Sequence, residues 1–87
     1  MYIDRLKDGK LLREVGRMCK RQREINNITT GEIASYLGCT EQNIRMFEIG
    51  QNRNICILFA YLKLIKDKVS RKVFFETLIC LLDHYED

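Results

Sequence analysis

Residues 28–50 read ITTGEIASYLGCTEQNIRMFEIG and contain two helix starts in close succession. Thr29 followed by Glu32 fits a capping box, in which each side chain bonds to the backbone N–H of the other residue. Thr40 is a second candidate N-cap. Gly38, which precedes it, suits the left-handed conformation that ends a helix. The pattern therefore predicts two short helices joined by a tight turn.

The spacing of three small or apolar residues predicts how these two helices pack. Ala34 is small enough for a close approach, Gly38 permits the turn, and Ile44 directs the second helix back onto the core. Any helical hairpin can carry one of these features. The three together, with matching caps, favour a helix-turn-helix, which we place at about residues 29–50.

The rest of the chain also favours helices. It contains no proline, shows little alternation of β-branched residues, and separates its apolar segments with capping residues. Three more helices are expected: from Asp4 or Asp8 to about Ile25, from Ile55 to about Lys66, and from just after Ser70 to about His84. We therefore predict an all-α fold of five helices in a single domain over residues 1–87, in which the helices at about 55–85 supply core and dimer contacts.

Composition excludes several classes of protein. The 87 residues are 46% hydrophobic and 31% charged, which is typical of a globular chain and argues against disorder. The longest apolar run, Ile55–Leu62, is far shorter than the roughly 20 residues that a membrane span needs. The first residues lack the basic and apolar pattern of a signal peptide. We expect a soluble, cytoplasmic protein that does not bind membranes.

Charge is distributed unevenly along the chain. The formal net charge is +3, but residues 5–23 alone hold eight Lys or Arg against Asp8 and Glu14. A basic segment of this kind is typical of a surface that faces a polyanion, although a solvated helix face would have the same composition.

The sequence shows no pattern of catalytic or metal-binding residues. Its four cysteines are isolated at positions 19, 39, 56 and 80, without the paired spacing of a zinc site. Each is interpreted as a small buried hydrophobe. The chain also lacks a nucleophile–base pair, paired carboxylates and a glycine-rich phosphate loop. We therefore predict no cofactor, no metal and no enzymatic activity.

Two segments resemble a known family. Residues 15–23, VGRMCKRQR, and residues 40–50, TEQNIRMFEIG, resemble the first helix and the recognition helix of the phage repressor and Cro class of helix-turn-helix DNA-binding proteins. The similarity covers about residues 12–66. It implies a Cro/repressor-like domain that binds double-stranded DNA, in which Arg23 pairs with Glu48.

The chain departs from the family pattern at three positions. Thr30 stands where the family often has a glutamine that contacts the DNA backbone, Gln22 stands where an apolar residue is usual, and Asn54 or a neighbour stands where a proline is frequent. The first departure bears on one backbone contact, and the second bears on the packing of the first helix.

The outward face of the predicted recognition helix carries side chains that read DNA bases. At roughly 100° per residue, Ile44 and Phe47 face the domain, whereas Gln42, Met46 and Ile49 point away from it. Amides pair with adenine, guanidinium groups with guanine, and apolar groups with the thymine methyl. Glu41, at the helix start, either accepts from cytosine or favours the helix dipole. The predicted base-reading residues are Glu41, Gln42, Asn43, Arg45 and Met46.

Residues around that helix are expected to contact the DNA backbone. Helix starts offer free N–H groups and hydroxyls to phosphate, and polar or basic side chains of the flanking segments add to them. The two arginines of the first helix are the weaker candidates. The predicted residues are Arg17, Arg21, Thr29, Thr30, Thr40, Gln51, Asn52 and Arg53.

The last predicted helix has more apolar residues than one side of a helix can bury. This excess favours a subunit interface, although complete mutual cover by the last two helices would also account for it. A two-fold dimer would read two DNA half-sites about 34 Å apart. The predicted interface residues are Phe74, Phe75, Leu78, Leu81, Leu82 and Tyr85.

These features together predict a sequence-specific transcriptional regulator, a homodimeric repressor that binds a palindromic operator through the major groove. The alternative is a protein-interaction module with the same fold, such as an antirepressor, an antitoxin or a small inhibitor, which presents Met46 and Ile49 to a regulatory protein. Loss of binding at high salt would favour DNA as the partner, and salt-insensitive association would favour a protein.

Overall fold

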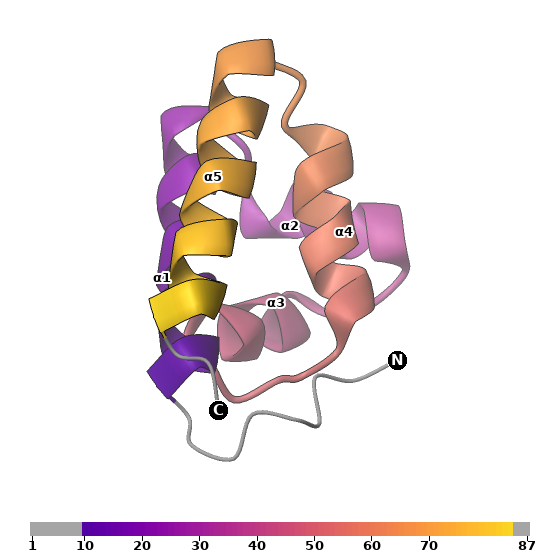
Figure 1. Cartoon of the computed structure of the whole chain (residues 1–87). Helices are drawn as coiled ribbons and strands as arrows, with labels where there is room; N and C mark the ends of the chain where they lie inside the picture. Colours follow the sequence, from indigo (N-terminus) through magenta and orange to yellow (C-terminus); the bar gives the residue numbers. More distant parts are fainter. Residues whose placement is uncertain (1–9, 85–87) are drawn as a thin grey trace.

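The computed structural model describes residues 10–84, which form five α-helices and the loops between them (Figure 1). The prediction of an all-α chain is confirmed for this part of the sequence. The predicted helix start at Asp4 or Asp8 lies outside the described residues. The helices are α1 (Lys10–Ile25), α2 (Thr30–Leu37), α3 (Glu41–Glu48), α4 (Ile55–Leu64) and α5 (Lys68–His84).

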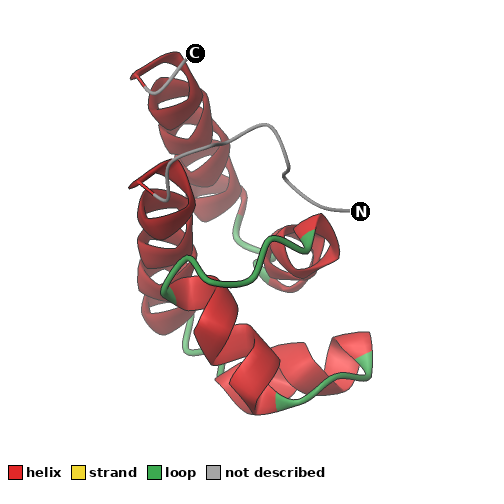
Figure 2. Ribbon diagram, turned by 90° about the horizontal axis from the view of Figure 1, so that it is seen from below, coloured by secondary structure: helices red, strands yellow, loops and turns green. Residues whose placement is uncertain are grey.

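The helix α1 is the centre of the arrangement. It lies beside α5, which runs in the opposite direction, and it also contacts α3 and α4 (Figures 1 and 2). The helix α2 packs on α3 and α4. None of the described helices is long and apolar enough to cross a membrane. The most completely buried core residues are Leu11, Cys19, Ile33, Ile44, Ala60, Tyr61, Ile65 and Phe74.

The predicted caps of α2 and α3 are confirmed. Thr29 Oγ1 accepts from the Glu32 N–H at 3.0 Å while the Glu32 carboxylate accepts from the Thr29 N–H at 3.2 Å, so the capping box is complete. Thr40 Oγ1 accepts from the Asn43 N–H at 3.3 Å and caps α3. Gly38 ends α2 in the left-handed region, with a φ of 72°. These local bonds determine where α2 ends and α3 begins.

Two glycines allow α1 to pack directly against the end of α3. A Cβ at Gly16 would lie 2.5 Å from the carbonyl oxygens of Phe47 and Glu48. A Cβ at Gly50, where φ is +81°, would lie 2.7 Å from Arg13 Cγ and 2.8 Å from its Cα. The backbones of the two helices therefore approach with no layer of side chains between them.

The predicted boundary between the last two helices is wrong by a few residues. The helix α4 ends earlier than expected, and α5 begins at Lys68 rather than after Ser70. The reason is that Asp67 caps α5, since its carboxylate accepts from the Ser70 N–H at 2.9 Å. Ile65, just before this cap, is fully buried, and the Arg71 guanidinium donates to its carbonyl. The connection is therefore short and anchored by its own residues.

Two predictions about buried residues need correction. Phe74 was expected at a subunit interface, but its side chain is 0% exposed within a single chain because it belongs to the core cluster. The interpretation of every cysteine as a buried hydrophobe is also wrong, since Cys56 and Cys80 are exposed while Cys19 is buried. The helices α4 and α5 thus each keep a solvent-exposed face.

We expect Gly16→Ala to lower the free energy of unfolding by about 1–3 kcal/mol, because the added Cβ overlaps backbone carbonyls of α3 that side-chain rotation cannot move aside. Gly31→Ala is the matched control, since a Cβ there would meet the Glu41 carboxylate at an ordinary 3.6 Å. Alanine is the better helix former, so the control is expected to be neutral or slightly stabilising. Urea unfolding followed by circular dichroism measures the free energy of unfolding of both variants. Equal changes in the two variants would contradict the close approach of α1 and α3.

Candidate functional site

The helix α3 divides its side chains between the core and the solvent. Ile44 and Phe47 are buried on its inner face, as predicted. Met46 is half-buried rather than fully outward, and the other predicted base-reading residues are exposed. The predicted base-reading set thus lies on the part of α3 that turns away from the core. The exposed members are Glu41, Gln42, Asn43 and Arg45.

The loop after α3 lies beside this face. It shares a shallow hollow of about 400 Å³ with two residues of α3. Asn52 Oδ1 accepts from the Asn54 N–H at 2.9 Å, and this bond shapes the loop. The structure therefore brings residues predicted for base reading and for backbone contact to one surface. Asn52 also has a structural role in the loop. The hollow is lined by Asn43, Met46, Gln51, Asn52 and Arg53.

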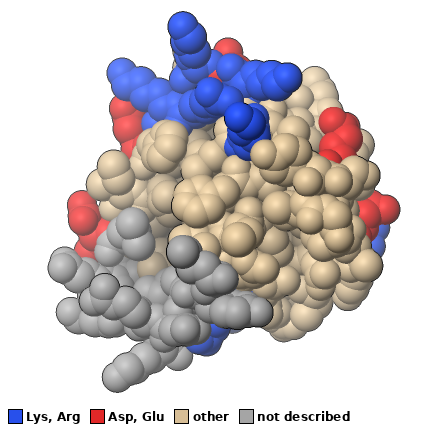
Figure 3. Space-filling view, turned by 90° about the vertical axis from the view of Figure 1, so that its right-hand side faces the viewer, with Lys and Arg blue, Asp and Glu red and all other residues tan. Residues whose placement is uncertain are grey.

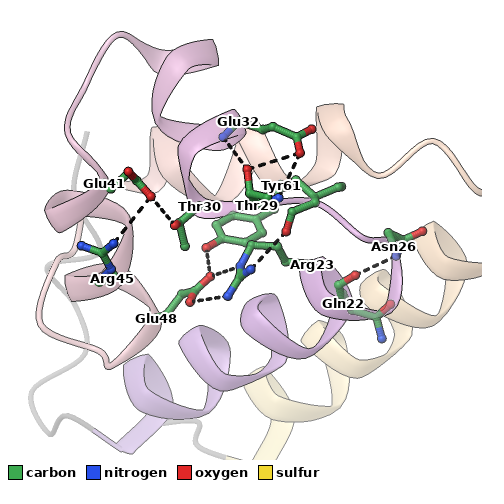
Figure 4. Close-up of polar contacts among 11 residues, drawn as sticks. Gln22, Arg23, Asn26, Thr29, Thr30, Glu32, Glu41, Arg45, Glu48 and Tyr61 are labelled. Carbon is green, nitrogen blue, oxygen red and sulfur yellow. Dashed lines mark hydrogen bonds and ion pairs between the residues drawn. The ribbon is translucent and has the colours of Figure 1, made fainter.

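The start of α2 is joined to the start of α3 by a carboxylate (Figure 4). Thr30 Oγ1 donates to Glu41 Oε1 at 2.8 Å, and Arg45 Nη2 lies 3.6 Å from the same oxygen. The Thr29 hydroxyl is used differently, since it belongs to the capping box with Glu32. Thr30, Glu41 and Arg45 were predicted as separate DNA contacts, whereas the structure makes them one connected group.

A cluster of buried polar groups holds the other end of α3 (Figure 4). Arg23 of α1 donates from Nε to Glu48 Oε2 at 2.7 Å and from Nη2 to Glu48 Oε1 at 3.2 Å, which confirms the predicted pair. Arg23 Nη1 also donates to the Ile28 carbonyl at 3.1 Å. Tyr61 of α4 donates its hydroxyl to Glu48 Oε2, and its ring stacks on Phe47 with centroids 5.9 Å apart. One carboxylate therefore joins α1, α3 and α4.

Tyr61 is the member of this cluster that the sequence analysis did not identify. It lies in a segment that reads as apolar on nearly every side. The one signal available was its hydroxyl, because a buried tyrosine hydroxyl usually finds a hydrogen-bond partner. Nothing in the local sequence identifies Glu48 as that partner.

The surroundings of Glu48 change the ionisation of three neighbouring groups. Burial raises the pKa of Tyr61, and the hydrogen bond to Glu48 raises it further because it stabilises the protonated hydroxyl. Burial also raises the pKa of the Cys19 thiol, with the negative charge of Glu48 as the second cause. The hydrogen bond to Glu48 raises the pKa of Arg23. At neutral pH the cluster therefore contains one ion pair, a neutral hydroxyl and a neutral thiol.

Two of the predicted backbone contacts lie away from α3. Arg17 and Arg21 are exposed, but they line a groove of about 440 Å³ between α1 and α5, whose other wall includes Val73 and Leu81. Arg17 also lies 3.4 Å from Glu14. Because the structure does not bring the two arginines to the surface around α3, we leave them out of the candidate site.

Exposed lysines gather at the connection between α4 and α5. Figure 3 shows Lys and Arg side chains at one edge of the face that it views, over this connection. The helix α3 lies near the start of α4, whereas the connection between α4 and α5 lies at the other end of α4 (Figure 1). This basic group is therefore not part of the candidate site. Its exposed lysines are Lys63, Lys66, Lys68 and Lys72.

Comparison of the chain with models of known protein families, with curated proteins and with solved structures finds no match. The described residues include no group of His, Cys, Asp and Glu that could hold a metal ion. The side chains of the surface around α3 carry amides, hydroxyls, guanidinium groups and one carboxylate, beside the apolar Met46 and Ile49.

We expect the free energy of unfolding to fall as the pH rises through the ordinary pKa values of cysteine, 9.0, and tyrosine, 10.0. In that range Cys19 and Tyr61 lose their protons in the unfolded chain, whereas their raised pKa values keep both neutral in the folded chain. The unfolded state then binds fewer protons, so alkaline pH favours unfolding. Urea unfolding at neutral and strongly alkaline pH, with a reductant present, measures this loss.

The double variant Cys19→Ala, Tyr61→Phe is expected to flatten this pH dependence, because it removes both groups. Tyr36→Phe is the matched control, since Tyr36 is 52% exposed. An unchanged pH dependence in the double variant would show that other groups cause the alkaline loss of stability.

Proposed function

We propose that the chain is a sequence-specific transcriptional regulator that binds double-stranded DNA by placing α3 in the major groove. The observation that supports this best is the division of α3 between a buried anchor and a polar outer face. Gln42 and Arg45 lie in solvent on that face, and their amide and guanidinium groups suit bidentate contacts with adenine and guanine. In this proposal α2 and α3 form a helix-turn-helix of the phage repressor and Cro type that the sequence resembles.

The dimensions of α3 are compatible with this placement. An α-helix with its side chains is about 10–12 Å in diameter, and the major groove of B-DNA, about 12 Å wide, admits such a helix. Polar groups flank both ends of the helix, with Thr30 near its start and Gln51 and Arg53 after its end. In the proposed complex these groups contact phosphates and so set the register of α3 in the groove.

We further propose that α5 joins two copies of the chain into a homodimer. Val69, Val73, Phe75 and Ile79 of α5 are between 43% and 70% exposed, so the chain itself leaves these apolar side chains in water. Of the predicted interface residues, Phe75 is one of these four. Leu78 and Leu81 pack partly against the core. The side chains of Leu82 and Tyr85 lie outside the described residues.

A dimer also suits the proposed DNA contact. One short recognition helix reads few base pairs, and a two-fold pair reads two half-sites about 34 Å or a multiple of it apart. A palindromic operator is then the expected target. Repression is the regulatory effect we propose, because occupation of a promoter is sufficient to block it.

One observation favours a second function, a protein-interaction module built on the same helices. Ile49, next to the end of α3, is 54% exposed, and Met46 lies nearby on α3. A hydrophobic groove of another protein would bury both side chains. Association of this kind would depend little on salt, whereas DNA binding would weaken steeply as salt rises.

We expect Gln42→Ala and Arg45→Ala each to lower the affinity for the specific DNA site by about 1–3 kcal/mol and to change binding to random duplex little. The reason is that each removes a base contact that random DNA does not offer. Selection from a pool of random duplexes identifies the site, and fluorescence anisotropy across a salt series measures both affinities.

Two further variants test the assignment of backbone contacts. Arg53→Ala is expected to weaken binding to all duplexes alike and to reduce the salt slope by about 0.9, because one phosphate contact is lost. Arg17→Ala removes the same charge in the groove between α1 and α5 and is the matched control. Absence of binding to any duplex at low salt would contradict the proposed function and favour the interaction module.

We expect Ile79→Glu to convert a dimer to a monomer and to weaken operator binding with it, because a charge would replace one of the apolar side chains that the proposed interface buries. Phe59→Glu is the matched control, since Phe59 is 55% exposed on α4. Leu78 is unsuitable for this test because it packs against the core of its own chain. Sedimentation velocity measures the mass, and an unchanged mass for Ile79→Glu would refute the α5 interface.

A further inference from the structure

The carboxylate of Glu41 lies at the start of α2, where a DNA phosphate is expected to bind. Its Oε1 accepts from the Thr30 hydroxyl at 2.8 Å. A Cβ on Gly31 would lie 3.6 Å from the same oxygen, so the carboxylate is also close to the backbone of the first turn of α2. The N–H groups of Thr30 and Gly31 lie in the first turn of α2, where an N–H has no acceptor within the helix, and such groups bind anions. An anion of the chain itself therefore already lies beside this helix start.

Starting from the proposed function, we propose that Glu41 is a specificity-determining residue, which competes with DNA phosphate at the start of α2 and so suppresses binding to random DNA. A phosphate that approaches α2 meets a carboxylate of the same sign. The Thr30 hydroxyl already donates to Glu41, so it is not free to donate to the phosphate. Binding requires Glu41 to leave this position.

The release of Glu41 also affects the base-reading face. Arg45 Nη2 lies 3.6 Å from Glu41 Oε1, so the carboxylate that holds Thr30 also attracts the guanidinium. The side chain of Arg45 is 59% exposed and that of Glu41 is 50% exposed, so solvent weakens the attraction between them. The pair is therefore weak enough to separate on DNA, and its separation frees Arg45 for a base.

The sequence of the DNA decides whether this separation is compensated. At a suitable G·C pair, Arg45 can bind the guanine edge and Glu41 can accept from the amino group of cytosine. At other sequences the carboxylate finds no donor and remains close to phosphates that repel it. The same residue thus favours one set of sequences and disfavours the rest, which raises the ratio of specific to random affinity.

A simpler role for Glu41 is a hydrogen-bonded clip between α2 and α3 that stabilises the fold. Glu41→Gln separates the two roles, because the amide keeps an oxygen that accepts from Thr30 but removes the charge. Glu76→Gln is the matched control, since Glu76 is an exposed carboxylate on α5 and its loss changes the net charge equally. Because Glu76 adjoins Phe75 in the proposed dimer interface, sedimentation velocity first checks that this variant has the same mass as the wild type. Thermal unfolding of both variants checks that each is folded.

The experiment measures the affinities of the wild type and both variants for the selected operator and for a random duplex, across a salt series. For Glu41→Gln we expect a severalfold gain on random duplex, a steeper salt slope by up to about 0.9, and no comparable gain on the operator. Glu76→Gln is expected to leave the ratio of operator to random affinity unchanged.

Two results would overturn the inference, and they are distinguishable from each other. If the wild type binds DNA and Glu41→Gln changes random binding no more than Glu76→Gln does, the inference fails while the proposed function stands. If neither the wild type nor Glu41→Gln binds any duplex at low salt, the proposed function fails and the inference fails with it.

Discussion

The placement of α3 depends on one buried carboxylate. Glu48 is only 7% exposed, and it accepts hydrogen bonds from a guanidinium of α1 and a hydroxyl of α4. Loss of either donor would leave a buried charge with too few partners, which costs far more than loss of a surface contact. A buried ion pair is weak evidence of stability in itself, because desolvation offsets its attraction. Its consequence here is geometric, since Arg23 and Tyr61 can both reach Glu48 only when three helices meet in one arrangement.

The orientation of the candidate surface follows from that anchor. With Glu48 directed inward, the helical period turns Gln42 and Arg45 toward solvent. A rotation of α3 about its axis would expose Ile44, which is 0% exposed, and would bury polar groups in its place. The close approach at Gly16 also prevents a partial rotation of α3, because the backbone of α1 contacts the last carbonyls of α3 and no side chain lies between them that could adjust. The packing of the core therefore determines which side chains form the outer face of α3.

The sequence predicts interactions between near neighbours better than interactions between distant residues. The caps of α2 and α3 act within a few residues, so the pattern alone placed these two helices. Phe74 and Phe75 show the limit, since they are adjacent and alike, yet one is 0% and the other 49% exposed. The packing of α5 on α1 determines which of the two is buried, and no local sequence pattern indicates this packing.

Asp67 and Ser70 are likewise both good caps, and the anchored connection before α5 determines which one is used. The Tyr61 contact with Glu48 joins residues on different helices and was missed for the same reason.

Association through α5 would also act on the surface around α3, because both helices depend on α1. The helix α5 buries Phe74 and part of Leu78 in its own chain but leaves other apolar side chains, such as Phe75 and Ile79, in water. Cover of these side chains by a second copy would stabilise folded α5 by removing apolar area from water. Since α5 packs along α1, and α1 carries both Gly16 and Arg23, the dimer would hold in place the helix on which α3 rests. Dimerisation would then raise DNA affinity in two ways: it adds a second half-site, and it stabilises by mass action the arrangement that orients the first.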